Sequence, residues 1–132
     1  MTAKPATLFW SRFDLAAGRF SSARSTAFKV PYPISDVRHI SDVKVDTTGG
    51  VFVTSASDPG NDGPFSSAMY YAGGLRPAAD KTFVFIQPSG FTRIYEFAYH
   101  KVEAFEFVPG ADGGLVFGTD DENLGAAVLL SY

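Results

Sequence analysis

Two segments of the sequence follow the same pattern, and this pattern limits the chain to few folds. Residues 40–46 alternate apolar and polar side chains strictly, as a half-buried strand does, and residues 102–108 superpose on them. A glycine pair then leads into a second apolar run in each copy, as in a β-hairpin. Each copy continues through an Asp-rich loop into a further strand, at residues 67–71 and 126–132. The chain therefore contains an internal repeat.

Composition and periodicity predict an all-β fold. The 132 residues suffice for one compact domain, which we place at residues 1–132. The 13 glycines and 8 prolines are typical of short strands and tight turns, and no window sustains the three-four apolar spacing of a long helix. The expected strands cover residues 6–14, 25–30, 40–46, 51–55, 67–71, 82–87, 93–99, 102–108, 113–117 and 126–132. Phe105 and Phe117, on two of these strands, are expected to be buried.

The order strand, tight turn, strand, polar loop, strand is that of a β-propeller blade. It divides the chain into repeat units of antiparallel strands at roughly residues 6–36, 37–98 and 99–132. Closed propellers usually need four or more blades. We therefore expect an incomplete propeller, a propeller closed by oligomerisation, or a twisted sandwich with blade-like sequence. An open blade exposes unpaired backbone groups, so self-association is the expected partnership.

Charge and composition exclude several other partners. A net charge of −3 without a basic stripe argues against nucleic acid. Residues 1–5 lack the apolar core of a signal peptide and no run reaches membrane-spanning length, so we expect a soluble chain without membrane contact. The absence of cysteine removes disulfides, thiolate metal sites and cysteine nucleophiles. It also leaves the cellular compartment open.

The second copy resembles a known family. Residues 100–105, Gly113-Gly114-Leu115 and residues 119–125 resemble the last blades of esterase-like phytase-type propellers, which carry a Lys-Val/Ile-Glu-Gly-Leu strand, a turn, and a strand that ends in an Asp-Asn-Asp-Phe-Gly-like loop. Residues 40–58 look like a preceding blade, so the resemblance covers about the last two thirds of the chain.

The resemblance carries an expectation about function. More distantly, Glu103 is similar in position to a metal-binding glutamate of calcium-dependent lactonase and phosphotriesterase propellers. The resemblance implies a hydrolase ancestry and a calcium ion near the central axis. Because the chain is less than half of a complete propeller, another subunit or further sequence would have to complete such a site.

The residues themselves offer one candidate metal site. Calcium prefers six to eight oxygen ligands. Oxygen-bearing side chains follow one predicted strand directly, at Asp120, Asp121, Glu122 and Asn123. The alternative is a solvated turn in which Asp and Asn cap backbone groups. Glu103 is either a ligand or polar anchor, for which Lys101 or Arg93 is the available partner, or an ordinary solvent-facing residue.

Other candidate sites lie on loops and strand ends. The loop at residues 57–64 offers Asp58, Asn61 and Asp62 to a small-molecule ligand of unknown identity, although its Gly and Pro content is typical of a structural turn. His100 with Glu103 is the weak candidate for a catalytic acid–base pair, and His39 occupies a similar place in the first copy. The aromatic side chains favour packing over binding: Tyr70, Tyr71, Tyr95 and Tyr99 across strands, and Trp10 in the core beside Phe9.

Two functions remain in competition at this level. The first is a non-catalytic, propeller-like module that binds or assembles through its loops and open edges. The second is a metal-assisted, calcium-dependent hydrolase of the esterase, phytase or lactonase kind, with Glu103 and residues 120–123 near the ion. The chain has no Gly-x-Ser-x-Gly nucleophile motif, which favours the first.

Overall fold

The computed structural model describes residues 5–110 and 113–131, except for the side chains of Arg38 and His39. The fold is all-β, as predicted, and every strand pairing in this part of the chain is antiparallel. No helix within the described ranges has the length and apolar character needed to cross a membrane. The elements are β1 (Ala6–Trp10), β2 (Phe13–Asp14), β3 (Arg19–Phe20), β4 (Arg24–Phe28), β5 (Val37–Val45), β6 (Gly50–Ser57), β7 (Ser66–Pro77), β8 (Phe83–Ile86), β9 (Thr92–Ala98), β10 (Val102–Val108), β11 (Gly114–Thr119), the 3-10 turn η1 (Glu122–Leu124) and β12 (Val128–Ser131).

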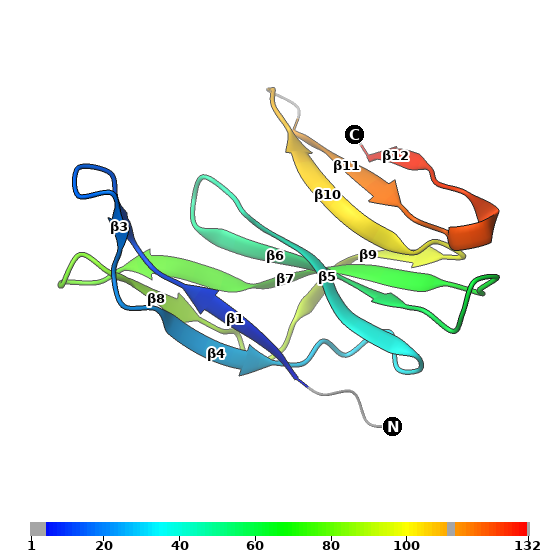
Figure 1. Cartoon of the computed structure of the whole chain (residues 1–132), viewed down its shortest axis with the longest axis horizontal. Coiled ribbons are helices and arrows are strands. Elements are labelled where there is room, and N and C mark those ends of the chain that lie inside the picture. The colour runs from blue at the N-terminus through cyan, green and yellow to red at the C-terminus, as the bar shows by residue number, and fades with distance from the viewer. Residues whose placement is uncertain (1–4, 111–112, 132) are drawn as a thin grey trace.

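A five-stranded sheet forms the centre of the molecule (Figure 1). Its order is β5-β6-β7, and the far edge of β7 pairs with β9 along one half and with β8 along the other. Strand β6 is buried along nearly its whole length because its residues are apolar or small. A strand that is buried on both faces occupies the middle of a layered fold.

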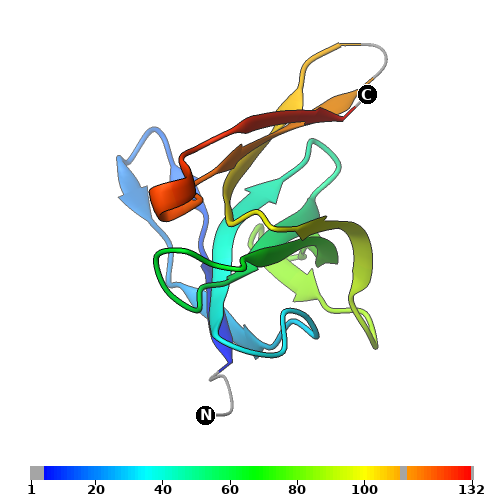
Figure 2. The same cartoon turned by 90° about the vertical axis from the view of Figure 1, so that its right-hand side faces the viewer.

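Two further layers cover opposite faces of the central sheet (Figure 2). The β1-β4 ribbon and the segment after it cover the face that carries Val51 and Val53. The β10-β11-β12 sheet covers the other face, where Phe105 and Phe117 are 2% and 1% exposed. Phe52 belongs to this second core, as expected for a residue between Val51 and Val53 on a strand. The predicted burial of Phe105 and Phe117 is confirmed.

Side chains of the central sheet attach β10 to it without a backbone ladder. Ser41 Oγ donates to the carbonyl of Val102 at 2.7 Å, and Ser67 Oγ accepts the Val102 N–H at 2.9 Å. Asp42 Oδ2 accepts the N–H of Phe105 at 3.0 Å. These bonds satisfy backbone groups of β10 that would otherwise be buried without a partner.

Several predicted strand bounds differ from the observed ones. The run at residues 6–14 divides into β1 and β2, and β2 pairs with β3 in a separate small ribbon. Strand β7 continues through the glycine pair to Pro77, whereas the predicted strand ended at Tyr71. Gly73 permits this continuation: its φ is 143°, and a Cβ there would lie 2.4 Å from the carbonyl oxygen of Ile86 on the adjacent strand.

Tyr70 packs in the core, in agreement with the preference for packing over binding, whereas the neighbours of Trp10 differ from those expected. Tyr70 is 1% exposed, and its hydroxyl donates to the carbonyl of Tyr32. Trp10 packs on Phe85 and donates its Nε1–H to the carbonyl of Phe83, whereas Phe9 is 66% exposed. Phe9 points away because successive side chains of a strand alternate between its faces.

Candidate functional site: an acidic cluster around Lys101

The two polar loops that the sequence presents separately lie side by side at one end of the molecule (Figures 1 and 2). One loop joins β6 to β7 and the other joins β11 to β12. The backbone N–H of Asn123 donates to the carbonyl of Asn61 at 3.2 Å. The Asn123 side-chain amide donates to Asp62 Oδ1 at 3.1 Å. The structure thus brings the candidate ligand loop and the candidate metal loop into direct contact.

Lys101 lies at the centre of this junction, directly before β10, and its side chain is 6% exposed. Four carboxylates surround its Nζ. Glu122 accepts a hydrogen bond from it, and Asp58 Oδ2 lies at 3.5 Å. Glu103 Oε1 and Asp120 Oδ2 lie at 3.9 and 4.0 Å. The Phe65 ring also faces the ammonium, with its centroid 5.7 Å from Nζ.

Electrostatics explain how a lysine can be buried here. Burial alone would lower the pKa of Lys101, because it disfavours the charged amine. The hydrogen bond to Glu122 and the charges of Asp58 and Asp120 outweigh that effect and raise the pKa of Lys101. The amine is therefore held as an ammonium, which makes it a poor nucleophile and a strong anchor for the surrounding carboxylates.

Glu103 has a different electrostatic position in the same cluster. Burial raises the pKa of Glu103, and the neighbouring Asp120, Asp58 and Glu122 raise it further, while Lys101 opposes them. Its side chain remains 42% exposed. Arg93, the other partner considered for Glu103, pairs instead with Glu96 at 2.7 Å.

A second hydrogen-bonded group adjoins the cluster and centres on Asp121, whose side chain is 8% exposed. Its carboxylate accepts the backbone N–H of Lys101 at 2.6 Å and the hydroxyl of Thr119 at 3.0 Å. His100 Nδ1 lies 2.8 Å from the same carboxylate. Burial would raise the pKa of Asp121, but the hydrogen bonds from His100, Lys101 and Thr119 outweigh it and lower that pKa.

The pairing with Asp121 orients the ring of His100. When Nδ1–H donates to the carboxylate, Nε2 carries the free lone pair of a neutral imidazole. The His100 side chain is 37% exposed, so solvent reaches the imidazole while Asp121 holds its orientation. The sequence suggested His100 with Glu103 as an acid–base pair. Among the described residues, His100 instead pairs with Asp121, and Glu103 pairs with Lys101. The side chain of His39 lies outside the described part of the structure.

The backbone beside the cluster adopts two unusual conformations. Tyr99 and Glu122 have φ values of 68° and 53°, in the left-handed region that non-glycine residues rarely occupy. The N–H of Tyr99 donates to the carbonyl of Phe65 at 2.9 Å, and this bond fixes the backbone that leads to Lys101. The ion pair with Lys101 holds Glu122 in place. Strained residues of this kind concentrate at functional sites.

The acids already share one cation, the Lys101 ammonium. Within residues 5–110 and 113–131, no group of three or more His, Asp or Glu side chains is arranged to hold a metal ion. An ion in this region would have to share Asp58, Glu103, Asp120 or Glu122 with Lys101, or displace its amine.

Reasoning from the sequence identified the acids but not their centre. From the sequence, Lys101 was considered only as a partner for Glu103, because its position beside a predicted strand is typical of an ordinary lysine. One signal was present in the repeat: Asp58 and Asp120 each follow the second strand of their copy directly. Equivalent positions in two packed copies are good candidates for a shared contact.

Comparisons of the chain with protein-family models, with curated proteins and with solved structures returned no match.

Proposed function

We propose that this chain is a non-catalytic binding and assembly module, built from blade-like meanders, that joins a second copy of itself along β12. The observation that carries the proposal is the outer edge of β12. This strand pairs with β11 on one side, and within the described ranges it has no strand on the other. An unpaired edge is a template for a further strand.

The side chains of β12 favour such pairing. Its sequence, Val-Leu-Leu-Ser, contains none of the lysines or prolines that commonly protect free edges. Val128 and Leu130 are 73% and 56% exposed on the outer face, and Leu124, just before the strand, is 68% exposed. Pairing with a copy would cover this apolar strip together with the backbone edge.

The hydrogen-bond register identifies which backbone groups are available. The N–H of Thr119 donates to the carbonyl of Ala127, so this pair faces inward toward β11. Backbone groups alternate along an antiparallel strand, which directs those of Val128 and Leu130 toward the free edge. Two copies related by a twofold axis would satisfy both edges in one antiparallel contact.

The first meander supports the same arrangement and the blade-like interpretation. Strands β5-β6-β7 and β10-β11-β12 have the same antiparallel order, so β12 corresponds to β7. β7 carries β8 and β9 on its outer edge. A strand from a second copy would occupy the corresponding place beside β12.

The test is solution mass by light scattering of the wild type and three variants. Leu130→Lys places a charge on the outer strip, and Leu130→Pro removes an outward N–H without removing a bond to β11. Leu15→Lys is the matched control, since Leu15 is 88% exposed on the β2-β3 ribbon. We expect a dimer for the wild type and the control, and monomers for both Leu130 variants. Dimers of all four proteins would exclude the β12 contact.

A calcium-dependent hydrolase is the second candidate, and the meeting of the two acidic loops favours it. In this proposal Glu103, Asp120 and Glu122 hold the ion, and the His100–Asp121 pair serves as base. The test is the melting temperature with calcium and with a chelator, for the wild type and for Glu103→Gln. Stabilisation by calcium that the variant loses supports this candidate. A melting temperature indifferent to calcium contradicts it.

A further inference from the structure

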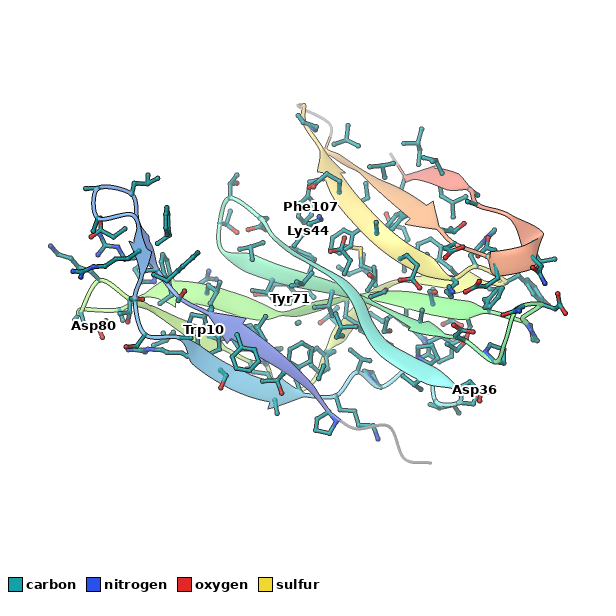
Figure 3. All side chains as sticks on the ribbon, in the orientation of Figure 1. Trp10, Asp36, Lys44, Tyr71, Asp80 and Phe107 are labelled. Atoms are coloured by element: carbon teal, nitrogen blue, oxygen red, sulfur yellow. The ribbon has the colours of Figure 1, made fainter. Side chains whose placement is uncertain are left out.

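A pocket of about 410 Å³ lies beside Trp10, away from the acidic cluster and from β12. Figure 3 shows Trp10 at the end of β1. Strands β7 and β8 contribute Leu75, Pro77 and Phe83, and the turn between β5 and β6 closes the other side. This volume falls within the range of small-molecule sites.

Both walls of the pocket are held in place. The Trp10 indole is fixed by its hydrogen bond to the Phe83 carbonyl at 2.9 Å and by its contact with Phe85. In the opposite turn, Asp46 Oδ1 accepts the N–H groups of Thr48 and Gly50, each at 2.8 Å. A site whose walls are already ordered loses little entropy when a ligand binds.

The polar groups of the pocket suit an uncharged ligand. Ser11 and Thr47 line it, and their hydroxyls make no hydrogen bond within the described part of the chain. Among the described residues that line the pocket, Asp46 has the only charged side chain, and its Oδ1 already accepts hydrogen bonds within the turn. The guanidinium of Arg76 lies behind the same turn and donates to the Thr48 carbonyl at 2.9 Å, which offsets the negative charge.

We propose that this pocket binds a neutral saccharide. One sugar ring stacks its C–H face on the Trp10 indole, and its hydroxyls reach Thr47 and Ser11. An aromatic platform beside free hydroxyls provides both an apolar surface and hydrogen-bond donors and acceptors, which a sugar ring requires. The site is independent of the proposed assembly contact, so either can fail without the other.

The test uses a property of the chain: Trp10 is its single tryptophan, so its fluorescence reports on this pocket directly. The probes are maltose, cellobiose and N,N′-diacetylchitobiose, titrated to millimolar concentration, with choline as a cationic ligand of aromatic sites. We expect a saturable change in emission with at least one saccharide and none with choline. No saturable change with any of the three, or saturation by choline alone, would overturn the proposal.

Variants assign the binding to the pocket, with calorimetry as the readout. Thr47→Val removes one hydroxyl and should weaken saccharide binding roughly fivefold. Trp10→Phe should weaken it at least about tenfold through the smaller stacking surface. Thr92→Val, the same change at an exposed site on β9, is the control and should bind as the wild type does. Equal affinity in all variants would also overturn the proposal.

Discussion

Replacement of Lys101 by methionine tests the electrostatic core of the acidic cluster. Methionine keeps much of the side-chain length and removes the charge. The change leaves Asp58, whose side chain is 9% exposed, among other carboxylates without the ammonium that neutralises them. Removing one member of a buried ion pair typically costs about 3–5 kcal/mol, because the remaining charge is left buried.

The structure places the expected loss near the lower limit of that range. Glu122, Glu103 and Asp120 keep 33%, 42% and 62% of their side chains exposed, so water can solvate them after Lys101 is lost. We therefore expect Lys101→Met to lower the free energy of unfolding by about 3 kcal/mol. For a chain of this size, the melting temperature should fall by roughly 10–15 °C.

Urea unfolding followed by circular dichroism measures this loss, and Lys44→Met is the matched control. Lys44 Nζ lies 3.5 Å from Asp42 and 3.6 Å from Glu106, but its side chain is 33% exposed. Its replacement should cost less than about 1 kcal/mol. The double variant Lys101→Met, Asp58→Asn should recover part of the loss, because it removes a buried charge.

The alkaline limb of the stability curve provides a second measurement on the same variant. The pKa of Lys101 is raised above its ordinary value of 10.5. Its contribution to stability is therefore fully present below that pH and lost as the pH rises through the folded-state pKa. Lys101→Met should lack this part of the alkaline loss. A variant as stable as Lys44→Met, with an unchanged alkaline limb, would show that the Lys101 ammonium does not stabilise the fold.

Three further predictions concern the core, the acid limb and the sheet. Phe117→Ala should cost about 3–5 kcal/mol in urea unfolding, whereas Phe9→Ala, at a 66% exposed position, should change little. The pKa of Asp121 is lowered from 3.8, so the stabilisation that its carboxylate provides is lost as the pH falls from that value through the folded-state pKa. Asp121→Asn should therefore lose less stability than the wild type over this pH range. Gly73→Ala should lower the melting temperature more than Gly90→Ala, since a Cβ at Gly90 meets nothing within 4 Å; equal shifts would contradict the strain argument.

Local pattern predicted the architecture at the level of strands. Alternation and glycine turns identified the strands of both meanders, and the apolar positions identified Phe105 and Phe117 as core. These features depend on neighbours in sequence, so the local pattern of residues is enough to predict them. The division of residues 6–14 and the full length of β7 depend on packing against other strands. The local pattern of residues carries no information on that packing.

Only part of the candidate site could be predicted from the sequence, for the same physical reason. Each acid could be named from its loop, but their meeting depends on contacts between distant segments, such as that of Lys101 with Asp58, 43 positions apart. Trp10 was expected in the core, because nothing local indicates that its indole forms the wall of a pocket.

Solution mass is the direct test of whether β12 joins a second copy. Light scattering of the wild type and of Leu130→Pro, each in calcium and then in chelator, separates the candidate functions. We expect a wild-type dimer that is indifferent to calcium and a monomeric variant that is folded by circular dichroism. A monomeric wild type in both conditions, or an oligomer that loosens only on chelation, would contradict this expectation.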